Sequence, residues 1–275
     1  MTRIPLWDGD VLLYQVGFAA ESSWRMQHAE KGIEIDLTEN PPPFSVAEEI
    51  VMNRISNTHA LVDADQPPIL FFTGNTNFRN EISTTGYKLR RGGKPYHYSN
   101  LKAFLKSEFE WEEVEGLEAD DLLAIFLTKL GDKSICIGAD KDLLQVSGWH
   151  YLYEYGKVAA FGPHKVEGYG EIRLDSNKKL RGWGMKFFYA QCIMGDPVDS
   201  IIGIPKSGPI KAYSVLKDTY DEATGFQAVK QLYLHHYGED ARDKLLENGR
   251  LLFMIRELDN QGKPVLWDFP KGWDG

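Results

Sequence analysis

The sequence predicts an α/β protein in which helices cover both faces of a twisted parallel sheet. Short apolar runs alternate with amphipathic stretches of helix length, an order typical of parallel strands joined by helices. No run approaches the ~20 consecutive apolar residues of a membrane span. With 275 residues, 43% of them hydrophobic and 26% charged, the chain is long enough for one large domain with an appendage.

The predicted elements follow one another in a regular order. Three prolines at residues 41–43 break the chain before Ser45, which stands three residues before Glu48 in a capping-box pattern that predicts a helix start. Expected strands cover residues 4–7, 69–72, 111–114, 134–137 and 149–155. Expected helices cover residues 11–21, 45–60, 100–109, 117–130 and 186–194, and the remaining third is mostly helical up to residues 251–258.

A Gly- and Asn-rich stretch at residues 168–179 is the predicted domain boundary. Residues 1–168 then form the α/β core, which includes a basic segment at residues 75–95. Residues 169–275 form a mostly helical region that carries the last acidic motif and a predicted helix-turn-helix at residues 199–216.

Carboxylates gather at four places, each at the end of an apolar run: Asp8 and Asp10; Glu118, Asp120 and Asp121; Asp140 and Asp142; Asp196 and Asp199. Ligands of parallel α/β sheets bind outside the carboxyl ends of the strands, and Asp8, Asp140 and Asp142 follow such ends. If the fold brings these groups together, two like charges about 4 Å apart cost on the order of 4 kcal/mol at an effective dielectric near 20. Bound cations or protons would offset that repulsion.

The residue types in these motifs select the metal. A single acid in the first turn of a helix is also explained by the helix dipole, but four convergent motifs indicate a metal site. Oxygen ligands without histidine or cysteine favour hard cations, so Mg²⁺ or Mn²⁺ is expected and zinc is not. Two such ions held by carboxylates are the usual means of hydrolysing a phosphodiester.

Positive charge flanks the acidic motifs, as an anionic substrate requires. The segment from Tyr87 to Lys94 carries four cations, Lys88, Arg90, Arg91 and Lys94, and Arg79 precedes it. A basic loop with a tyrosine suits a nucleic-acid strand, which needs phosphate neutralisation and a stacking surface. A solvated charged loop is the alternative interpretation of the same residues.

A second basic feature lies in the turn from Gly203 to Ala212. Its predicted helix, Gly/Pro turn and new helix start expose backbone amides to a phosphate near Lys206, Gly208 and Lys211. A plain interhelical turn is equally compatible with this pattern.

Overall charge and cysteine content set broader limits. The net charge of −9 argues against a nucleic-acid binder unless the acids are pooled in one site. Two cysteines, Cys136 and Cys192, are too few for a disulfide framework and suggest buried thiols in a reducing compartment. The first ten residues lack the layout of a secretory signal, so we expect a cytoplasmic protein, in the host cytoplasm if a phage encodes it.

The order of these motifs resembles the 5′ nuclease family of flap endonucleases and polymerase I 5′ nuclease domains, and is most similar to free-standing phage 5′→3′ exonucleases. The resemblance runs from Asp8 to about Ala212, with a weaker likeness at residues 251–267. It implies a PIN-like core, a helical arch, a monomer and metal-dependent hydrolysis of DNA at a 5′ end, nick or flap, or of an RNA-DNA hybrid, by two or more Mg²⁺ or Mn²⁺ ions.

The resemblance also implies roles for individual residues. The implied metal ligands are Asp8, Glu118, Asp120, Asp121, Asp140, Asp142, Asp196 and Asp199. The implied arch motif comprises Tyr87, on which the DNA end stacks, and Lys88 and Arg91, which steer the scissile phosphate, with Arg79 as a further catalytic group. The implied DNA contacts are Tyr87, Arg90, Lys94, Gly203, Lys206, Gly208 and Lys211, with K⁺ at the helix-turn-helix.

Two positions depart from the family pattern. Gly74 stands where the family usually has an aspartate after the second strand, with Asn75 or Asp10 as candidate substitutes. The turn at residues 206–209 lacks the usual Gly-x-Gly run, which leaves the K⁺ site open.

Two other functions are compatible with part of the sequence. Asp8 and Asp10 also resemble the nucleophile and general acid of haloacid-dehalogenase-type phosphatases. Such enzymes have no use for the motif at residues 118–121 or for the basic loop. A DNA-binding protein with a degenerate nuclease site is the other alternative, and Gly74 is the feature that favours it.

Overall fold

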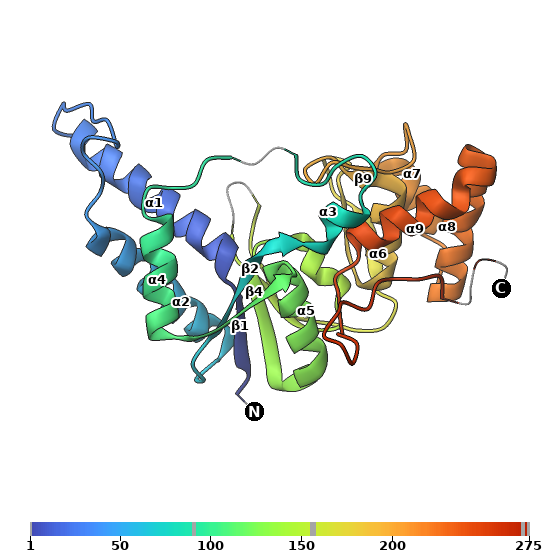
Figure 1. Cartoon of the computed structure of the whole chain (residues 1–275), viewed down its shortest axis with the longest axis horizontal. Coiled ribbons are helices and arrows are strands. Elements are labelled where there is room, and N and C mark those ends of the chain that lie inside the picture. Colours follow the sequence, from blue (N-terminus) through green and yellow to red (C-terminus); the bar gives the residue numbers. More distant parts are fainter. Residues whose placement is uncertain (1, 90–91, 155–157, 271–272, 274–275) are drawn as a thin grey trace.

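A six-stranded sheet in the order β3-β2-β1-β4-β5-β6 lies at the centre of the computed structural model, which describes residues 2–89, 92–154, 158–270 and 273 (Figure 1). Its strands are β1 (Ile4–Asp8), β2 (Ile69–Asn77), β3 (Glu110–Gly116), β4 (Ser134–Gly138), β5 (Gly148–Leu152) and β6 (Phe161–Val166). The first five run parallel, whereas β6 is antiparallel to β5.

The predicted α/β class is therefore correct, but the sheet is mixed rather than wholly parallel. The connection between β5 and β6, residues 153–160, is shorter than the crossover of a dozen or so residues that a parallel pair needs. The chain can return only as a hairpin, which the apolar pattern of residues 149–155 did not reveal.

Helices flank the sheet and fill the second half of the chain. They are α1 (Gly9–Ala29), α2 (Phe44–Val62), α3 (Phe78–Ile82), α4 (Tyr98–Glu108), α5 (Ala119–Leu130), α6 (Gly184–Met194), α7 (Pro209–Leu216), α8 (Glu222–Tyr237) and α9 (Ala241–Leu252), with 3₁₀ turns at Gly131–Lys133, Lys141–Gln145 and Gly238–Asp240. Helix α2 begins one residue before Ser45 and has no side-chain cap, so the predicted capping box is wrong.

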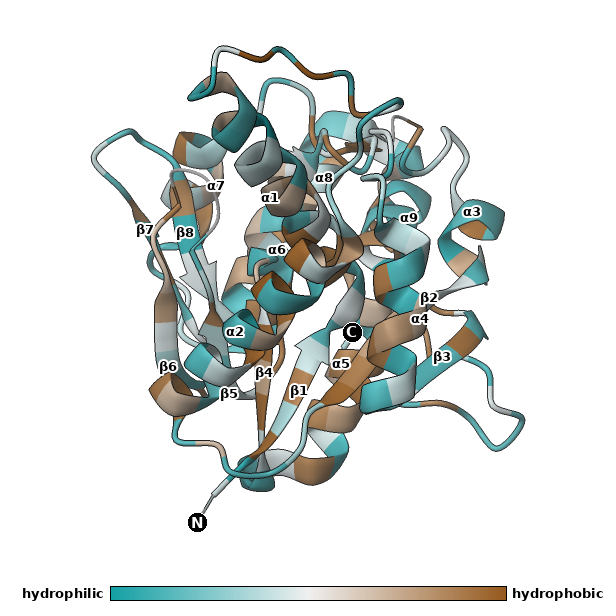
Figure 2. Cartoon of the chain, turned by 90° about the vertical axis from the view of Figure 1, so that its left-hand side faces the viewer, coloured by the Kyte–Doolittle hydropathy of each residue, from teal (hydrophilic) through white to brown (hydrophobic). Residues whose placement is uncertain are grey.

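Alternation along the strands produces two apolar layers. On β1, Trp7 packs with α1, α2 and α4, while Leu6 faces α5 on the other side. Phe72 and Phe71 of β2 divide in the same way. Figure 2 shows brown segments on strands such as β4, while the flanking helices carry both hydrophobic and hydrophilic bands. A sheet covered on both faces directs ligands to its ends.

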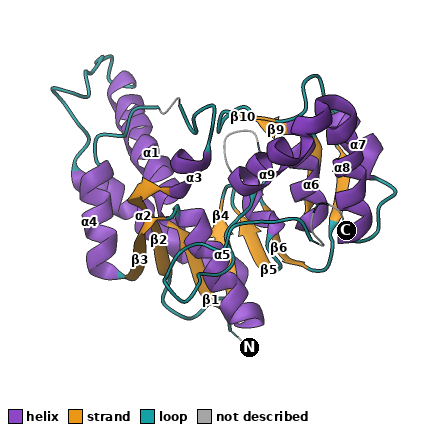
Figure 3. Cartoon of the chain, turned by 45° about the vertical axis from the view of Figure 1, so that its right-hand side comes forward, coloured by secondary structure: helices purple, strands orange, loops and turns teal. Residues whose placement is uncertain are grey.

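A third apolar core fills the part of the chain after residue 169. Helices α6, α7, α8 and α9 pack around Phe188, Tyr189 and Tyr233 (Figure 3). This region also contains strands, the antiparallel pair β7 (Glu171–Leu174) and β8 (Leu180–Trp183) and the short pair β9 (Gly195–Asp196) and β10 (Ile201–Ile202). The last helix was expected to cover residues 251–258, but helix α9 ends at Leu252. The domain boundary remains a prediction.

The arch segment differs from the expected helical arch. Within the described part of residues 75–95, only α3 is helical. Residues 83–89 and 92–97 lead from the side of α3 toward α4, above the carboxyl ends of the strands in the view of Figure 1. Gly86, Gly92 and Gly93 are poor helix formers, which accounts for the extended path.

The predicted helix-turn-helix is also corrected. Residues 195–202 form the β9–β10 pair, so α7 is preceded by a hairpin and not directly by a helix. A Cβ atom at Gly195 or Gly203 would lie within 2.5 Å of the backbone of the facing segment. This close approach explains why glycine occupies both positions. Among the described residues, no helix is long and apolar enough to cross a membrane.

His150 provides a test of this core. It lies fully buried in β5, its Nε2 donates to the Val146 carbonyl oxygen at 2.7 Å, and burial lowers its pKa to about 4. Between pH 6.5 and 4 the unfolded chain therefore binds a proton that the folded chain does not, and stability falls as the pH falls. The contribution is about 3 kcal/mol at most over this range.

We expect His150→Gln to flatten that pH dependence. The measurement is the free energy of unfolding by urea at pH 4.5, 5.5 and 7 for the wild type and the variant. His235→Gln, which changes an exposed helix residue, is the matched control and should follow the wild-type slope. An unchanged slope in the His150 variant would contradict a buried neutral imidazole.

Candidate metal centre and nucleic-acid interface

Three carboxylates from separate elements act on one another at the carboxyl edge of the sheet. Asp8 ends β1, Asp120 lies in the first turn of α5, and Asp140 follows β4. Burial and then the charges of Asp10 and Asp140 raise the pKa of Asp8 to about 7. Burial and then the charges of Asp8 and Asp140 raise the pKa of Asp120 well above its usual range. The charge of Lys88 opposes this effect at Asp120, but the pKa of Asp120 remains raised.

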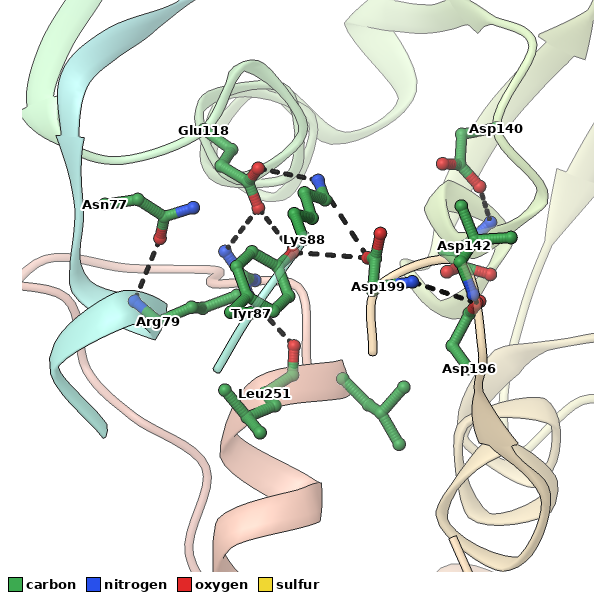
Figure 4. A network of polar contacts seen from close by, with 12 residues as sticks. Asn77, Arg79, Tyr87, Lys88, Glu118, Asp140, Asp142, Asp196, Asp199 and Leu251 are labelled. Atoms are coloured by element: carbon green, nitrogen blue, oxygen red, sulfur yellow. Dashed lines mark hydrogen bonds and ion pairs between the residues drawn. The ribbon is translucent and has the colours of Figure 1, made fainter. Parts of the chain in front are cut away.

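A second acidic group lies beside the first. Asp142 is 7% exposed, and burial followed by the charge of Asp140 raises its pKa to about 6. Lys141 Nζ lies 2.8 Å from Asp142 Oδ1 and 3.6 Å from Asp196 Oδ2. Asp196 Oδ1 accepts the backbone N–H of Asp199 at 3.4 Å, which brings the last motif into the group (Figure 4).

Glu118 has a different environment, because cations already surround it. Lys88 Nζ lies 2.6 Å from Glu118 Oε1, and Arg79 Nη1 lies 3.2 Å from Oε2. Lys88 also lies 3.9 Å from Asp199, so its ammonium stands between the two carboxylates in Figure 4. Burial alone would raise the pKa of Glu118, but the charges of Lys88 and Arg79 lower it.

Tyr87 is buried and does not form an exposed stacking surface. Its side chain is 7% exposed and belongs to the core of the helical region. Its hydroxyl donates to Glu118 at 2.8 Å and contacts Asp199 at 3.2 Å. The expectation that a DNA end stacks on Tyr87 is therefore wrong for this conformation, because the ring is packed inside.

Arg79 and Asp121 also lie outside the reach of a substrate. The guanidinium binds Asp121 through two bonds of 2.6 and 2.8 Å and donates to the carbonyl oxygens of Leu251 and Phe253, both at 2.9 Å. Asp121 is fully buried and also accepts the Ile255 N–H at 3.1 Å. We therefore assign this pair to the framework of the site and remove Asp121 from the metal ligands and Arg79 from the catalytic residues.

Gly74 cannot be replaced by an aspartate without a change in the sheet. A Cβ atom there would lie 2.5 Å from the carbonyl oxygen of Val114 in β3. Of the two candidate substitutes, Asn75 is exposed and bonds Glu115 on the outer edge. Asp10 instead is half-buried, and its charge raises the pKa of Asp8.

The basic residues of the arch are only partly described. Arg90 and Arg91 lie outside the described residues. Lys94 is exposed, with its ammonium 4.3 Å from the ring centre of Tyr98. A cavity of about 720 Å³ beside it is lined by Asp10, Thr73, Lys88 and Glu118 among others, so the acidic edge opens toward this loop.

The residues expected to grip duplex DNA lie on a separate exposed turn. Lys206 and Lys211 are exposed, and Gly208 precedes the first turn of α7. Gly203 is buried, and its carbonyl oxygen accepts the Tyr237 hydroxyl at 3.0 Å. That carbonyl is thus already engaged, which does not favour a K⁺ site there.

Sequence reasoning missed two residues that bind the acids. Lys141 is the middle residue of Asp140-Lys141-Asp142, and its charge between two acids was a signal in the motif itself. Gln191 donates to Asp142 at 2.7 Å from α6, a contact that no local pattern could indicate.

The donor set fits hard divalent cations. All candidate ligands are carboxylate oxygens, and the excess charge lies at Asp8, Asp120 and Asp140. Within the described residues, no three acidic, histidine or cysteine side chains are arranged to hold a metal ion as they stand. Binding would require these carboxylates to approach one another more closely.

Known proteins support the same interpretation at the level of sequence. No protein-family model matches the chain. Over 165 residues it is 32% identical to DNA polymerase I of Borreliella burgdorferi, a match that covers 57% of this chain and 16% of the polymerase. It is 24% identical over 194 residues to a 5′-3′ exonuclease of Buchnera aphidicola, covering 65% of this chain and 62% of that protein. The chain thus matches less than two thirds of either relative's length.

Solved structures match the fold. A bacteriophage T5 5′-exonuclease with bound zinc superposes with a TM-score of 0.57 at 16% identity, covering 91% of this chain and 89% of that one. A complex of a bacteriophage T5 flap endonuclease with DNA and metal ions gives a TM-score of 0.54 at 16% identity and covers 91% of this chain and 88% of that one.

The chain resembles 5′ nucleases in sequence and shares their fold. The resemblance predicted from the motif order is therefore confirmed. The phosphatase alternative loses support, because Asp10, its presumed general acid, is bound to the backbone N–H of Thr73 at 3.0 Å.

The buried ion pair between Arg79 and Asp121 can be tested by its removal. We expect Arg79→Met to destabilise the fold by about 3–5 kcal/mol, because the Asp121 carboxylate would remain buried without its cationic partner. The double variant Arg79→Met/Asp121→Leu should recover part of that loss. The measurement is the free energy of unfolding in urea.

Arg242→Met is the matched control for this experiment. It removes an exposed guanidinium that pairs with Asp243 at 3.2 Å, and exposed pairs contribute less than about 1 kcal/mol. Equal effects of the two arginine substitutions would exclude a framework role for Arg79.

Proposed function

We propose that this protein is a metal-dependent 5′→3′ exonuclease and structure-specific flap endonuclease that hydrolyses DNA and leaves 5′-phosphate products. The observation that carries this proposal is the convergence of four acid-bearing segments at one edge of a 5′ nuclease fold, with their repulsion unbalanced at Asp8, Asp120 and Asp140. Such an arrangement stabilises bound cations, and cations there would face a substrate phosphate.

The metal centre would be held by seven of the eight predicted ligands. They are Asp8, Glu118, Asp120, Asp140, Asp142, Asp196 and Asp199. Bound Mg²⁺ or Mn²⁺, two or more ions, would supply the activation of water and the stabilisation of the leaving oxygen.

Lys88 would act on the substrate from the arch. Its ammonium lies between Glu118 and Asp199, and its side chain is 26% exposed, so it has access to the cavity beside the acids. A phosphodiester there would compete with these carboxylates for the ammonium, which would then neutralise charge on the phosphoryl oxygens. Arg91 is proposed for the same task, and Tyr87 holds Glu118 and Asp199 in place.

The exposed turn before α7 would bind the duplex. Lys206 and Lys211 would contact phosphates, and the amides at the start of α7 would add a further contact near Gly208. Lys94 and Arg90 would neutralise the strand near the arch. We propose DNA with a 5′ end, nick or flap as the partner, with an RNA-DNA hybrid and K⁺ as candidates, and a monomeric cytoplasmic enzyme.

The deciding experiment is a product ladder from 5′- and 3′-labelled duplex and flap DNA with Mg²⁺, Mn²⁺ or EDTA. Release of mono- and short oligonucleotides from the 5′ end only when Mg²⁺ or Mn²⁺ is present would support the proposal. Asp140→Asn should abolish this cleavage. Asp132→Asn is the matched control, because Asp132 precedes β4 at the opposite edge of the sheet and pairs with Lys165.

The other outcomes identify the alternatives. Binding of DNA without cleavage under any metal would indicate a binding protein with a degenerate site. Neither binding nor cleavage would return the phosphatase as the better candidate.

We further expect Lys88→Ala to slow the chemical step on the order of a hundredfold while DNA binding changes little. Lys94→Ala, an exposed cation of the same loop, should weaken binding at low salt and leave the single-turnover rate nearly unchanged. Single-turnover kinetics with a labelled flap and a filter-binding assay measure the two effects. A loss confined to binding in the Lys88 variant would contradict its assigned role.

A further inference from the structure

Thr73 connects the segments that carry the acids of the metal centre. It lies near the end of β2, where its backbone N–H donates to Asp10 Oδ2 at 3.0 Å. Its side-chain Oγ1 accepts the backbone N–H of Ala119 at 3.1 Å. Ala119 is the first residue of α5 and stands between Glu118 and Asp120. One residue, through its backbone N–H and its hydroxyl, therefore links the start of α1, the end of β2 and the start of α5.

The bond to Asp10 continues the sheet where β1 has ended. Strands β1 and β2 are paired up to Asp8 and Phe71, after which β1 turns into α1. The Asp10 carboxylate then takes the place of the missing strand and accepts the next inward N–H of β2. Asp8, two residues earlier, is thereby fixed relative to β2.

The bond to Ala119 fixes α5 in the same way. The Gly74 N–H adds a second tie, since it donates to the Leu117 carbonyl oxygen at 3.2 Å. The absence of a side chain at Gly74 permits this approach, because a Cβ would meet Val114 at 2.5 Å. Asp120 follows Ala119 directly in α5, so these two hydrogen bonds also set the position of Asp120 relative to Asp8.

These ties oppose a repulsive force. Asp8 is buried at the end of β1 and Asp120 lies partly buried in the first turn of α5, and like charges on these two segments repel each other. The hydrogen bonds of Thr73 and Gly74 hold the segments together against that repulsion. Groups that orient metal ligands from behind typically change metal affinity by about 10- to 100-fold when they are removed.

We propose that Thr73, anchored by Asp10, is a positioning residue that holds the Asp8 and Asp120 segments in register for metal binding. The inference rests on the proposed function. Thr73 contacts no ligand itself, and its effect reaches the metal through the backbone of Ala119. The chemical class of ligand is a hard divalent cation, and the probe is Mn²⁺ alone.

The test is a calorimetric titration of the full chain with Mn²⁺ in the absence of DNA. Thr73→Val keeps the shape and the backbone bond to Asp10 but removes the hydroxyl, which accepts from Ala119 and also bonds Asp10. We expect Mn²⁺ affinity to fall about 10- to 100-fold. Thr73→Ser restores the oxygen and should restore the affinity. Thr76→Val is the matched control, because that hydroxyl lies on the same strand and bonds only the exposed Glu115 in the described contacts.

A second pair of variants covers the case in which Thr73→Val does not melt cooperatively. Asp10→Asn can still accept the Thr73 N–H, whereas Asp10→Ala cannot, so the alanine variant should bind Mn²⁺ more weakly than the asparagine variant. Equal Mn²⁺ affinity for the wild type, Thr73→Val and Asp10→Ala would overturn the inference. A wild-type chain that binds no Mn²⁺ would overturn the proposed function itself, which keeps the two failures distinct.

Discussion

The buried ion pair between Arg79 and Asp121 is the interaction on which the rest of the structure depends. Arg79 follows β2 and Asp121 lies in the first turn of α5. Arg79 donates to the carbonyl oxygens of Leu251 and Phe253, and Asp121 accepts the Ile255 N–H, so the end of α9 and the chain after it are tied to the pair. A buried pair adds little net stability, but a single buried charge left alone is costly, so its geometry tolerates little variation. The pair therefore fixes the start of α5 against the helical region that carries the last acidic motif.

Two kinds of carboxylate result from this framework. Glu118 lies between Arg79 and Lys88, and its charge is stabilised by them. Asp8 is buried and Asp120 is partly buried, and desolvation together with neighbouring carboxylates raises the pKa of both. The pKa of Glu118 is therefore lowered, whereas the pKa values of Asp8 and Asp120 at the same edge of the sheet are raised. Glu118 is stabilised by a lysine, and Asp8 and Asp120 are the acids best suited to a metal ion. Thr73 and Asp10 link the chain segments that carry Asp8 and Asp120.

The same acids also fix the position of the arch residues Tyr87 and Lys88. Tyr87 and Lys88 are adjacent, yet the tyrosine is packed in the core and the lysine faces the cavity. The arch is therefore anchored on the acids by Tyr87, and the cation beside it is placed close to the site. Sequence reasoning assigned both residues to the substrate, because it had no means of knowing which of two neighbours points inward.

The sequence by itself determined the class of fold, most of the strands and the four acidic motifs that follow them, because hydrophobic periodicity and motif order are local properties. The motif order also indicated the resemblance to 5′ nucleases. Only the tertiary structure decided that β6 is antiparallel, that Asp121 and Arg79 are paired, and that Lys141 and Gln191 bind Asp142. The physical reason is that charge balance and burial depend on residues far apart in the chain, whereas the sequence pattern records only what stands beside each residue.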